Sequence, residues 1–351
     1  MKTLNEILSQ LAVPIVAVTG TNGKSSVCKM IEEMLLAAGQ RVFLAGAEFG
    51  PIEKIEGNES NFDVAVLELK SSVLQKLPNL KPKVAVLTSL VPAHFERHAT
   101  VSEYFEAKKN SFRNQDSNDI LIYNAEGQPA RDLVDKAWSN KIPYTLNQDL
   151  PPIFLRKINH EINYVQNEVI EKFSLDHFKL LGEHQKLNAM AAIAVVKCFR
   201  VSQPLIQKCV AGFESLPDRL KKVGVWQERA FFSDLKAANP LATAWAVSSF
   251  RNPLILIMGG DEISDGYTDL WGVVQQKVKK IIFFGKARFR IFNLFKSNNQ
   301  NNVRCYTVRC LQDAIRLSKK KSGEGECVLI SPSHPLNTDL ILIKELEKIN
   351  N

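Results

Sequence analysis

Residues 14 to 30 read Pro-Ile-Val-Ala-Val-Thr-Gly-Thr-Asn-Gly-Lys-Ser-Ser-Val-Cys-Lys-Met, and this stretch decides the fold. Ile15 to Val18 is a short apolar run rich in β-branched residues, which is typical of a buried parallel strand. The glycine-containing segment Gly20 to Ser25 then turns the chain. Ser26 to Gly39 has the apolar spacing of an amphipathic helix that ends at glycine. The stretch therefore predicts a strand, a tight turn and a helix.

A turn of this composition suits phosphate groups. Its glycines allow backbone N–H groups to approach a ligand closely, and the helix N-terminus adds positive potential. Lys24 would reach the terminal phosphates, and Ser25 would give its hydroxyl to Mg²⁺. Val18 stands where the strict P-loop pattern has its first glycine, so an ordinary strand–turn–helix connection is the alternative. The expected nucleotide contacts are Gly20, Thr21, Asn22, Gly23, Lys24, Ser25 and Ser26.

The length and composition indicate an ordinary globular protein of two domains. The chain has 351 residues, of which 45% are hydrophobic and 23% charged. No apolar run reaches the ~18 residues needed to span a bilayer, and the first residues do not resemble a signal peptide. The six cysteines are scattered, which favours a reducing compartment over a disulfide framework or a zinc ribbon. We therefore expect a cytoplasmic protein with no membrane partner.

The charge balance is basic, with a formal net charge of +8. The densest basic cluster, Lys319 to Lys321, lies at an apparent helix end, where cations suit the helix dipole. Anionic small-molecule substrates explain the positive balance as well as a polyanion would. The sequence therefore does not favour a nucleic-acid partner.

Other predicted strands and helices carry candidate functional residues at or after their ends. Asp63 to Leu69 predicts a strand with Glu68 near its carboxyl end, and ligands of doubly wound sheets lie beyond such ends. The run from Lys83 to Ser89 predicts another strand, and the loop after it contains His94. A helix expected from Val101 to Phe112 carries Lys108.

The second half of the chain begins a new series of strands and helices. Short alternating runs between about 140 and 180 predict a small antiparallel insertion, and two helices follow it. The pattern restarts near residue 216, so we place a domain boundary between residues 213 and 214. The fold class is α/β, with parallel sheets flanked by helices in both domains.

The order of these motifs resembles that of the Mur ligases. The supporting phrases are Val-Thr-Gly-Thr-Asn-Gly-Lys-Ser-Ser (18–26), Leu-Glu-Leu-Lys-Ser-Ser (67–72), Ala-His-Phe-Glu-Arg-His (93–98), Tyr-Phe-Glu-Ala-Lys (104–108) and Leu-Pro-Asp-Arg (216–219). The resemblance implies a central P-loop ATP-binding domain at 1–213 and a Rossmann-like C-terminal domain at 214–351. It also implies an ATP-dependent, ADP-forming amide ligase of peptidoglycan precursor synthesis. The motifs are most similar to those of the branch that adds D-glutamate to UDP-N-acetylmuramoyl-L-alanine through an acyl phosphate.

The family likeness assigns a metal-assisted catalytic group. It implies that Ser25 and Glu68 hold one Mg²⁺ and that His94 helps to hold a second. Lys108 matches the lysine that the family carbamylates, which gives an anion that helps to hold the second metal ion, and Lys24 is the phosphate-binding lysine. Considered alone, Glu68 would be a solvated strand-end carboxylate and Lys108 an exposed helix lysine.

The same likeness places further contacts along the chain. Asn188 matches a position beside the adenine, and Arg219 and Asp234 match nucleotide contacts from the second domain. Arg219 considered alone could form an interdomain salt bridge. The residues expected to contact substrate are Lys236, Asn239 and Ser331.

The sequence also departs from the family pattern on the acceptor side. The family has an N-terminal UDP-binding domain with no counterpart among these motifs, so a separate chain could supply it. The substituted positions are Glu48, Lys70, Ala93, Gln185 and Ile263. Two alternatives stay open. One is a divergent ligase that joins an amino acid to another carboxylate, and the other is a nucleotide-binding pseudo-ligase with a protein partner.

Overall fold

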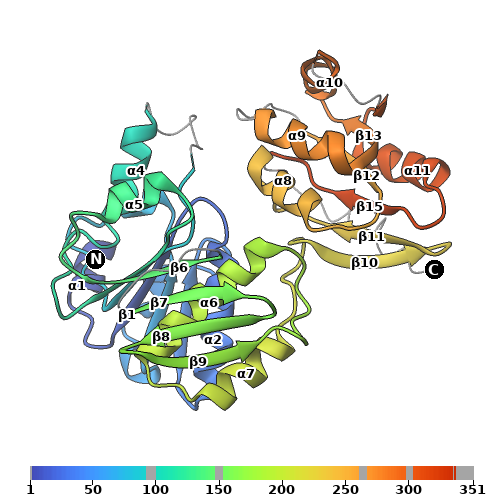
Figure 1. Cartoon of the computed structure of the whole chain (residues 1–351). Helices are drawn as coiled ribbons and strands as arrows, with labels where there is room; N and C mark the ends of the chain where they lie inside the picture. Colours follow the sequence, from blue (N-terminus) through green and yellow to red (C-terminus); the bar gives the residue numbers. More distant parts are fainter. Residues whose placement is uncertain are drawn as a thin grey trace. The chain divides into compact units, whose positions relative to one another are not determined.

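The computed structural model describes residues 2–91, 100–146, 153–260, 267–297, 303–334 and 336. The chain forms two compact α/β units (Figure 1). Unit 1 comprises Met1–Leu180 and His184–Glu214, and unit 2 comprises Leu181–Glu183 and Ser215–Asn351. The sequence placed the domain boundary after residue 213, beside the division after Glu214.

Unit 1 is built on one sheet with the strand order β2-β3-β1-β4-β5-β6-β7-β8-β9. Neighbouring strands are parallel from β2 to β7, and β8 and β9 are added antiparallel. The strands are β1 (Ile15–Thr19), β2 (Val42–Gly46), β3 (Val64–Glu68), β4 (Val84–Leu87), β5 (Ile120–Asn124), β6 (Asn140–Thr145), β7 (Ile153–Ile158), β8 (Glu161–Gln166) and β9 (Val169–Ser174).

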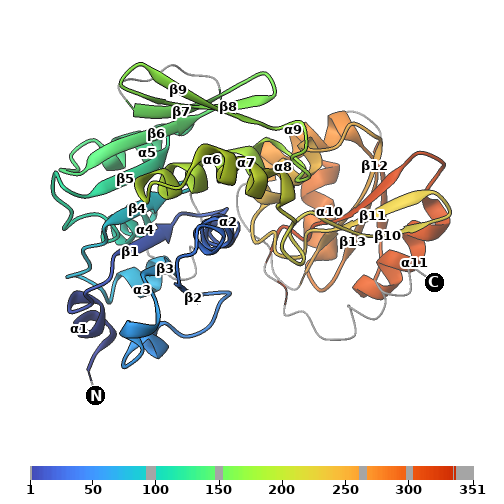
Figure 2. The ribbon, with the colours of Figure 1, turned by 90° about the horizontal axis from the view of Figure 1, so that it is seen from below.

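Helices cover both faces of this sheet, so its central strands are buried on both sides. Val16 and Val18 of β1 face one core, and Ile15 and Ala17 face the other. The first face packs against α2 (Lys24–Ala37), α6 (Glu183–Cys198) and α7 (Gln203–Gly212) (Figure 2). The opposite side carries α1 (Leu4–Ser9), the 3₁₀ turns Ile52–Ile55 and Glu59–Asn61, α3 (Ser71–Leu74), α4 (Val101–Lys109) and α5 (Gln128–Val134).

Unit 2 has the strand order β10-β11-β15-β12-β13-β14, and only the β10–β11 pair is antiparallel. After β14 the chain returns to place β15 between β11 and β12. Because parallel crossovers are right-handed, this return puts α11 on the face opposite α8, α9 and α10. The elements are β10 (Lys221–Trp226), β11 (Arg229–Ser233), α8 (Pro240–Ser248), β12 (Leu254–Gly259), α9 (Tyr267–Lys277), β13 (Val278–Phe284), α10 (Arg288–Lys296), β14 (Arg304–Thr307), α11 (Leu311–Lys321) and β15 (Cys327–Ile330).

The expected α/β class with mainly parallel sheets is confirmed, and three strands were missed. They are β6, β10 and β14. The segment from 140 to 180 is also not a separate insertion, because β6 and β7 pair in parallel and join the antiparallel strands to the large sheet. Among the described residues, no helix is both long and apolar enough to cross a membrane.

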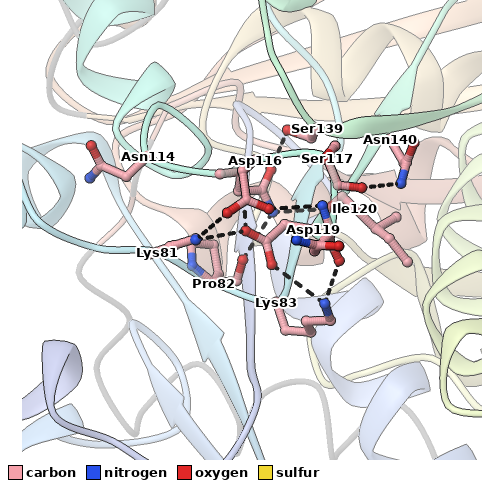
Figure 3. A network of polar contacts seen from close by, with 12 residues as sticks. Lys81, Pro82, Lys83, Asn114, Asp116, Ser117, Asp119, Ile120, Ser139 and Asn140 are labelled. Carbon is pink, nitrogen blue, oxygen red and sulfur yellow. Dashed lines mark hydrogen bonds and ion pairs between the residues drawn. The ribbon is translucent and has the colours of Figure 1, made fainter.

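A polar network fixes the start of β4 against the segment that leads into β5 (Figure 3). Lys81 Nζ lies 2.6 Å from an Asp116 carboxylate oxygen and 3.6 Å from one of Asp119. Lys83 Nζ lies 3.5 Å from the other oxygen of Asp119. Both lysine side chains are about half exposed, so these pairs are solvated and individually weak.

Gln115 is the buried member of this network. Its Nε2 donates to the carbonyl oxygens of Pro82 and Ile120, both at 3.0 Å. Its Oε1 accepts from Ser139 Oγ at 2.8 Å, and the Gln115 side chain is almost fully buried. One amide thus joins three segments of unit 1.

We predict that Gln115→Ala costs more stability than Lys81→Ala. The first leaves buried polar groups without their partners, which lowers the free energy of unfolding by about 1–3 kcal/mol. The second breaks solvated, half-exposed ion pairs, which contribute little to stability. Urea unfolding followed by far-UV circular dichroism compares the two. Equal losses would contradict the role given to Gln115.

Candidate functional site

The turn between β1 and α2 requires glycine at two positions. Gly20 has a φ of +145° and Gly23 a φ of +91°, values that L side chains rarely adopt. A Cβ on Gly20 would lie 2.0 Å from Thr88 Oγ1, and one on Gly23 would lie 2.4 Å from Asn188 Oδ1. The turn therefore depends on close approach to β4 and α6 as well as on its own conformation.

The end of β4 holds the turn in place. Thr21 N donates to the Ser89 carbonyl at 2.7 Å, and Asn22 N donates to Ser89 Oγ at 2.9 Å. Thr88 Oγ1 donates to the Asn22 carbonyl at 2.6 Å. The backbone conformation of the turn is thus fixed by the protein itself, which spares a bound ligand the cost of ordering it.

Two lysines converge on one carbonyl of the turn. Lys24 Nζ donates to the carbonyl oxygens of Gly20 at 3.1 Å and Thr21 at 2.9 Å. Lys108 Nζ, from α4, donates to the same Gly20 oxygen at 2.8 Å. Burial, and to a smaller degree the charge of Lys24, lower the pKa of Lys108 well below its usual range. Only 1% of Lys108 is exposed, so the uncharged amine is favoured there.

Tyr104 packs between Lys108 and the turn. Lys108 Nζ lies 4.5 Å from the centre of the Tyr104 ring, and the Tyr104 hydroxyl lies 3.1 Å from Thr21 Oγ1. The three residues connect α4 to the turn. Sequence reasoning selected Lys108 as a site residue but not Tyr104, although Tyr104 begins the motif of residues 104–108 and lies one helical turn earlier on the same face.

Ser25 and Glu68 form a buried pair of oxygen groups. Ser25 is at the start of α2, and Glu68 ends β3, which pairs with β1. Ser25 Oγ lies 3.0 Å from both carboxylate oxygens of Glu68. A hydroxyl and a carboxylate suit Mg²⁺, which binds proteins through few ligands and keeps water or phosphate as the others. In the described ranges, no three His, Cys, Asp or Glu side chains gather as a metal site.

The structure also places Asn188 at the turn. It lies on α6 beside Gly23, and its Nδ2 donates to Gln185 Oε1 at 3.0 Å. Both amide side chains are buried. Ser26, in the first turn of α2, is buried as well. His94, which the sequence selected as a metal ligand, lies outside the described residues.

In unit 2, Asp234 and Ser331 come together because they follow neighbouring parallel strands, β11 and β15. Ser331 Oγ donates to Asp234 Oδ2 at 2.9 Å, and Leu220 N donates to Asp234 Oδ1 at 3.2 Å. Burial raises the pKa of Asp234 to about 7, although the charge of Arg219 favours its ionised form.

Two other selected residues lie close by in the sequence. Asn239 is the N-cap of α8, and its side-chain oxygen accepts from Ala242 N at 2.9 Å. Lys236 has an exposed side chain, and its backbone N–H donates to the Asp218 carbonyl at 3.0 Å. The cap explains Asn239 structurally, and its substrate role stays a prediction, as does that of Lys236.

We predict that Gly23→Ala destabilises the protein more than Gly39→Ala. Both glycines have a positive φ, +91° and +81°, so both variants pay a conformational cost of roughly 1–2 kcal/mol. Only the Cβ at residue 23 meets another group, whereas nothing lies within 4 Å at residue 39. Thermal unfolding should therefore show a further loss for Gly23→Ala, partly restored by adding Asn188→Ala. No restoration would mean that the contact with Asn188 does not limit the turn.

Comparisons with known proteins agree on one family. The model of the Mur ligase middle domain matches residues 18–196. The UDP-N-acetylmuramoylalanine–D-glutamate ligase of Listeria innocua is 30% identical over 328 residues, which cover 91% of this chain and 69% of that protein. The enzyme of the same name from Enterococcus hirae is 31% identical over 325 residues, covering 92% and 69%.

Solved structures support the same fold. Crystal structure II of MurF from Acinetobacter baumannii has a TM-score of 0.71 and 17% identity, covering 98% of this chain and 79% of that one. A pseudomurein peptide ligase type C from Methanothermus fervidus has a TM-score of 0.70 and 15% identity, covering 97% and 79%. MurF of Thermotoga maritima, solved in complex with ADP, has a TM-score of 0.68 and 15% identity, covering 98% and 81%.

Proposed function

Because the chain belongs to the Mur ligase family, we propose that it is a cytoplasmic, ATP-dependent, ADP-forming amide ligase of peptidoglycan precursor synthesis. We propose D-glutamate as the amino acid and UDP-N-acetylmuramoyl-L-alanine as the acceptor, after the reaction for which the relatives are named. The proposal rests on the fixed turn from Gly20 to Ser25. Lys24 Nζ donates to carbonyl oxygens of this turn, and Ser25 Oγ donates to the Glu68 carboxylate.

The turn supports ATP binding through its backbone and Lys24. Its N–H groups and the start of α2 favour an anion. Lys24 Nζ donates to two neutral carbonyls, and hydrogen bonds to phosphate oxygens are stronger than these. We therefore expect Lys24 to turn onto the terminal phosphates when ATP binds. Ser25 and Glu68 would hold Mg²⁺, which when bound neutralises charge on the phosphates.

The chemistry asked of this site is the activation of a carboxylate. An acceptor carboxylate oxygen attacks the γ-phosphorus, and the bond from that phosphorus to the ADP oxygen breaks. The amine of the amino acid then attacks the acyl carbon, phosphate leaves with its bonding electron pair, and the amine gives up a proton. Lys24 contributes positive charge where the phosphoryl oxygens carry negative charge.

Lys108 has the properties that carbamylation requires, and we propose that it is modified. An uncharged amine can attack the carbon of CO₂, whereupon a C=O π bond opens and the nitrogen gives up one proton to water; burial favours that uncharged form of the amine. The product is an anion close to Lys24, so an attraction would replace the repulsion between two ammonium groups. His94 remains a proposed ligand of a second Mg²⁺, and Asn188, Arg219 and Asp234 remain proposed nucleotide contacts.

An ADP-release assay tests the function. Purified chain is given ATP, Mg²⁺ and pairs of carboxylate and amino acid, including UDP-N-acetylmuramoyl-L-alanine with D-glutamate. Release of ADP with that pair supports the proposed function, whether the chain acts alone or needs an added UDP-binding domain. Lys24→Ala should lower both the release and the ATP affinity, because it removes a charge-assisted contact worth about 1.5–3 kcal/mol. ATP affinity is measured separately by calorimetry.

The alternatives give different results in the same assay. Release of ADP with another substrate pair would identify a divergent ligase. ATP binding with no release on any pair would identify a pseudo-ligase. Activity that needs an added UDP-binding domain from a relative would support the proposed separate chain. ATP affinity equal in Lys24→Ala and the parent would reject the nucleotide role of the turn.

For Lys108, we predict that Lys108→Ala is inactive and that acetate or formate restores part of its activity. A short carboxylate can occupy the place of the carbamate, whereas the alanine side chain carries no anion. Lys109→Ala is the matched control, since Lys109 lies on the same helix and its Nζ is 3.6 Å from a Glu106 oxygen. Full activity of Lys108→Ala without any additive would reject the modification.

A further inference from the structure

Thr243 of α8 has a buried hydroxyl that the proposed function does not use. The side chain is 0% exposed, and Thr243 Oγ1 lies 2.8 Å from Ser331 Oγ. Ser331 is also fully buried, and its Oγ donates to Asp234 Oδ2 at 2.9 Å. Three side chains from α8 and from the ends of β15 and β11 thus form one chain of hydrogen bonds.

The charge state of Asp234 decides which group donates and which accepts in each of these hydrogen bonds. An ionised carboxylate only accepts hydrogen bonds, and a serine hydroxyl has one proton to give. When Ser331 gives that proton to Asp234, its oxygen must accept from Thr243. Thr243 is then the donor that completes the chain. If Asp234 is protonated, the same three groups can form the chain in the opposite direction.

We propose that Thr243 is a positioning residue that, through Ser331, fixes the orientation of the Asp234 carboxylate and stabilises its ionised form. Removal of the Thr243 hydroxyl would leave the buried Ser331 oxygen without its donor and its hydroxyl without a fixed orientation. The proposal rests on the proposed function only in one respect, the role of Asp234 as a nucleotide contact. The hydrogen-bond chain itself stands on the geometry of unit 2.

The charged groups around Asp234 oppose one another, so the pKa of its carboxyl depends on hydrogen-bond donors such as Ser331. Arg219 favours the ionised form and Asp218 opposes it, while Asp218 Oδ1 accepts from Ser233 Oγ at 2.6 Å. Because burial raises the pKa of Asp234 to about 7, the carboxylate titrates near neutral pH. Each hydrogen bond to the ionised form lowers that pKa, so a lost donor raises it.

The raised pKa of Asp234 makes the stability of the folded protein depend on pH in a defined direction. The pKa of Asp234 is higher in the folded protein than in the unfolded chain, so the folded protein binds more protons between the two values. Its contribution to stability is therefore present at low pH and is lost as pH rises towards 7. A further rise of the pKa in Thr243→Val would extend this loss to higher pH.

The test compares Thr243→Val, which has the same shape without a hydroxyl, with Thr243→Ser, which keeps the donor. Carbon-13 NMR of the whole chain labelled at aspartate follows the Asp234 carboxyl carbon, whose signal is identified by its absence in Asp234→Asn. We expect the titration midpoint to rise by about half a unit to one unit in Thr243→Val and to stay near the parent value in Thr243→Ser. Ser331→Ala removes the direct donor and should raise the midpoint at least as far.

An unchanged midpoint in Thr243→Val would overturn the inference. If that variant fails to fold, the same result in Ser331→Ala would do so. ADP binding by calorimetry gives an independent measurement, because an ionised carboxylate accepts hydrogen bonds from sugar hydroxyls. We expect about two- to fivefold weaker binding at pH 7 in Thr243→Val, the fall in the ionised fraction of Asp234 that this shift produces, and little change in Thr243→Ser. A raised midpoint with unchanged ADP affinity would support the positioning role and reject Asp234 as a nucleotide contact.

Discussion

The hydrogen bond from Thr21 N to the Ser89 carbonyl, 2.7 Å long, ties the phosphate-type turn to the end of β4. Gly20 must be glycine for this approach, because any Cβ there would collide with Thr88. Once the turn is fixed, the Gly20 carbonyl points to a place that both Lys24 and Lys108 reach. The position of each lysine therefore depends on how close the carboxyl ends of the parallel strands β1 and β4 lie to each other.

Local sequence patterns were enough to predict this strand, turn and helix. The pattern also put Glu68 near the carboxyl end of a strand, where ligands of doubly wound sheets lie, but its pairing with Ser25 was implied by the family resemblance. Tyr104, Thr88 and Ser89 could not be selected in this way. Their importance comes from contacts with a turn that is far away in the sequence, and no spacing rule encodes such contacts.

The strands missed by sequence reasoning share a physical cause. β6 contains Pro143 and polar residues, and β14 has four residues at the sheet edge, so neither shows the apolar run of a buried parallel strand. β10 has an alternating pattern interrupted at Gly224, where the register with β11 shifts. In all three cases tertiary pairing stabilises a strand that local propensity only weakly favours.

Burial shifts the pKa of one titratable group in each unit, downwards for a lysine in unit 1 and upwards for an aspartate in unit 2. It favours the neutral amine of Lys108 in unit 1 and raises the pKa of the Asp234 carboxyl in unit 2. The Lys108 amine donates to a carbonyl oxygen, whereas the Asp234 carboxylate accepts from a hydroxyl and a backbone N–H and is further stabilised by the charge of Arg219. The net charge is distributed unevenly along the chain. Residues 1–214 contain equal numbers of basic and acidic residues, so residues 215–351 carry the whole net charge of +8. On the proposed function, the turn of unit 1 would hold phosphate through local amides and lysines, and the net positive charge of residues 215–351 would attract anionic substrates at longer range.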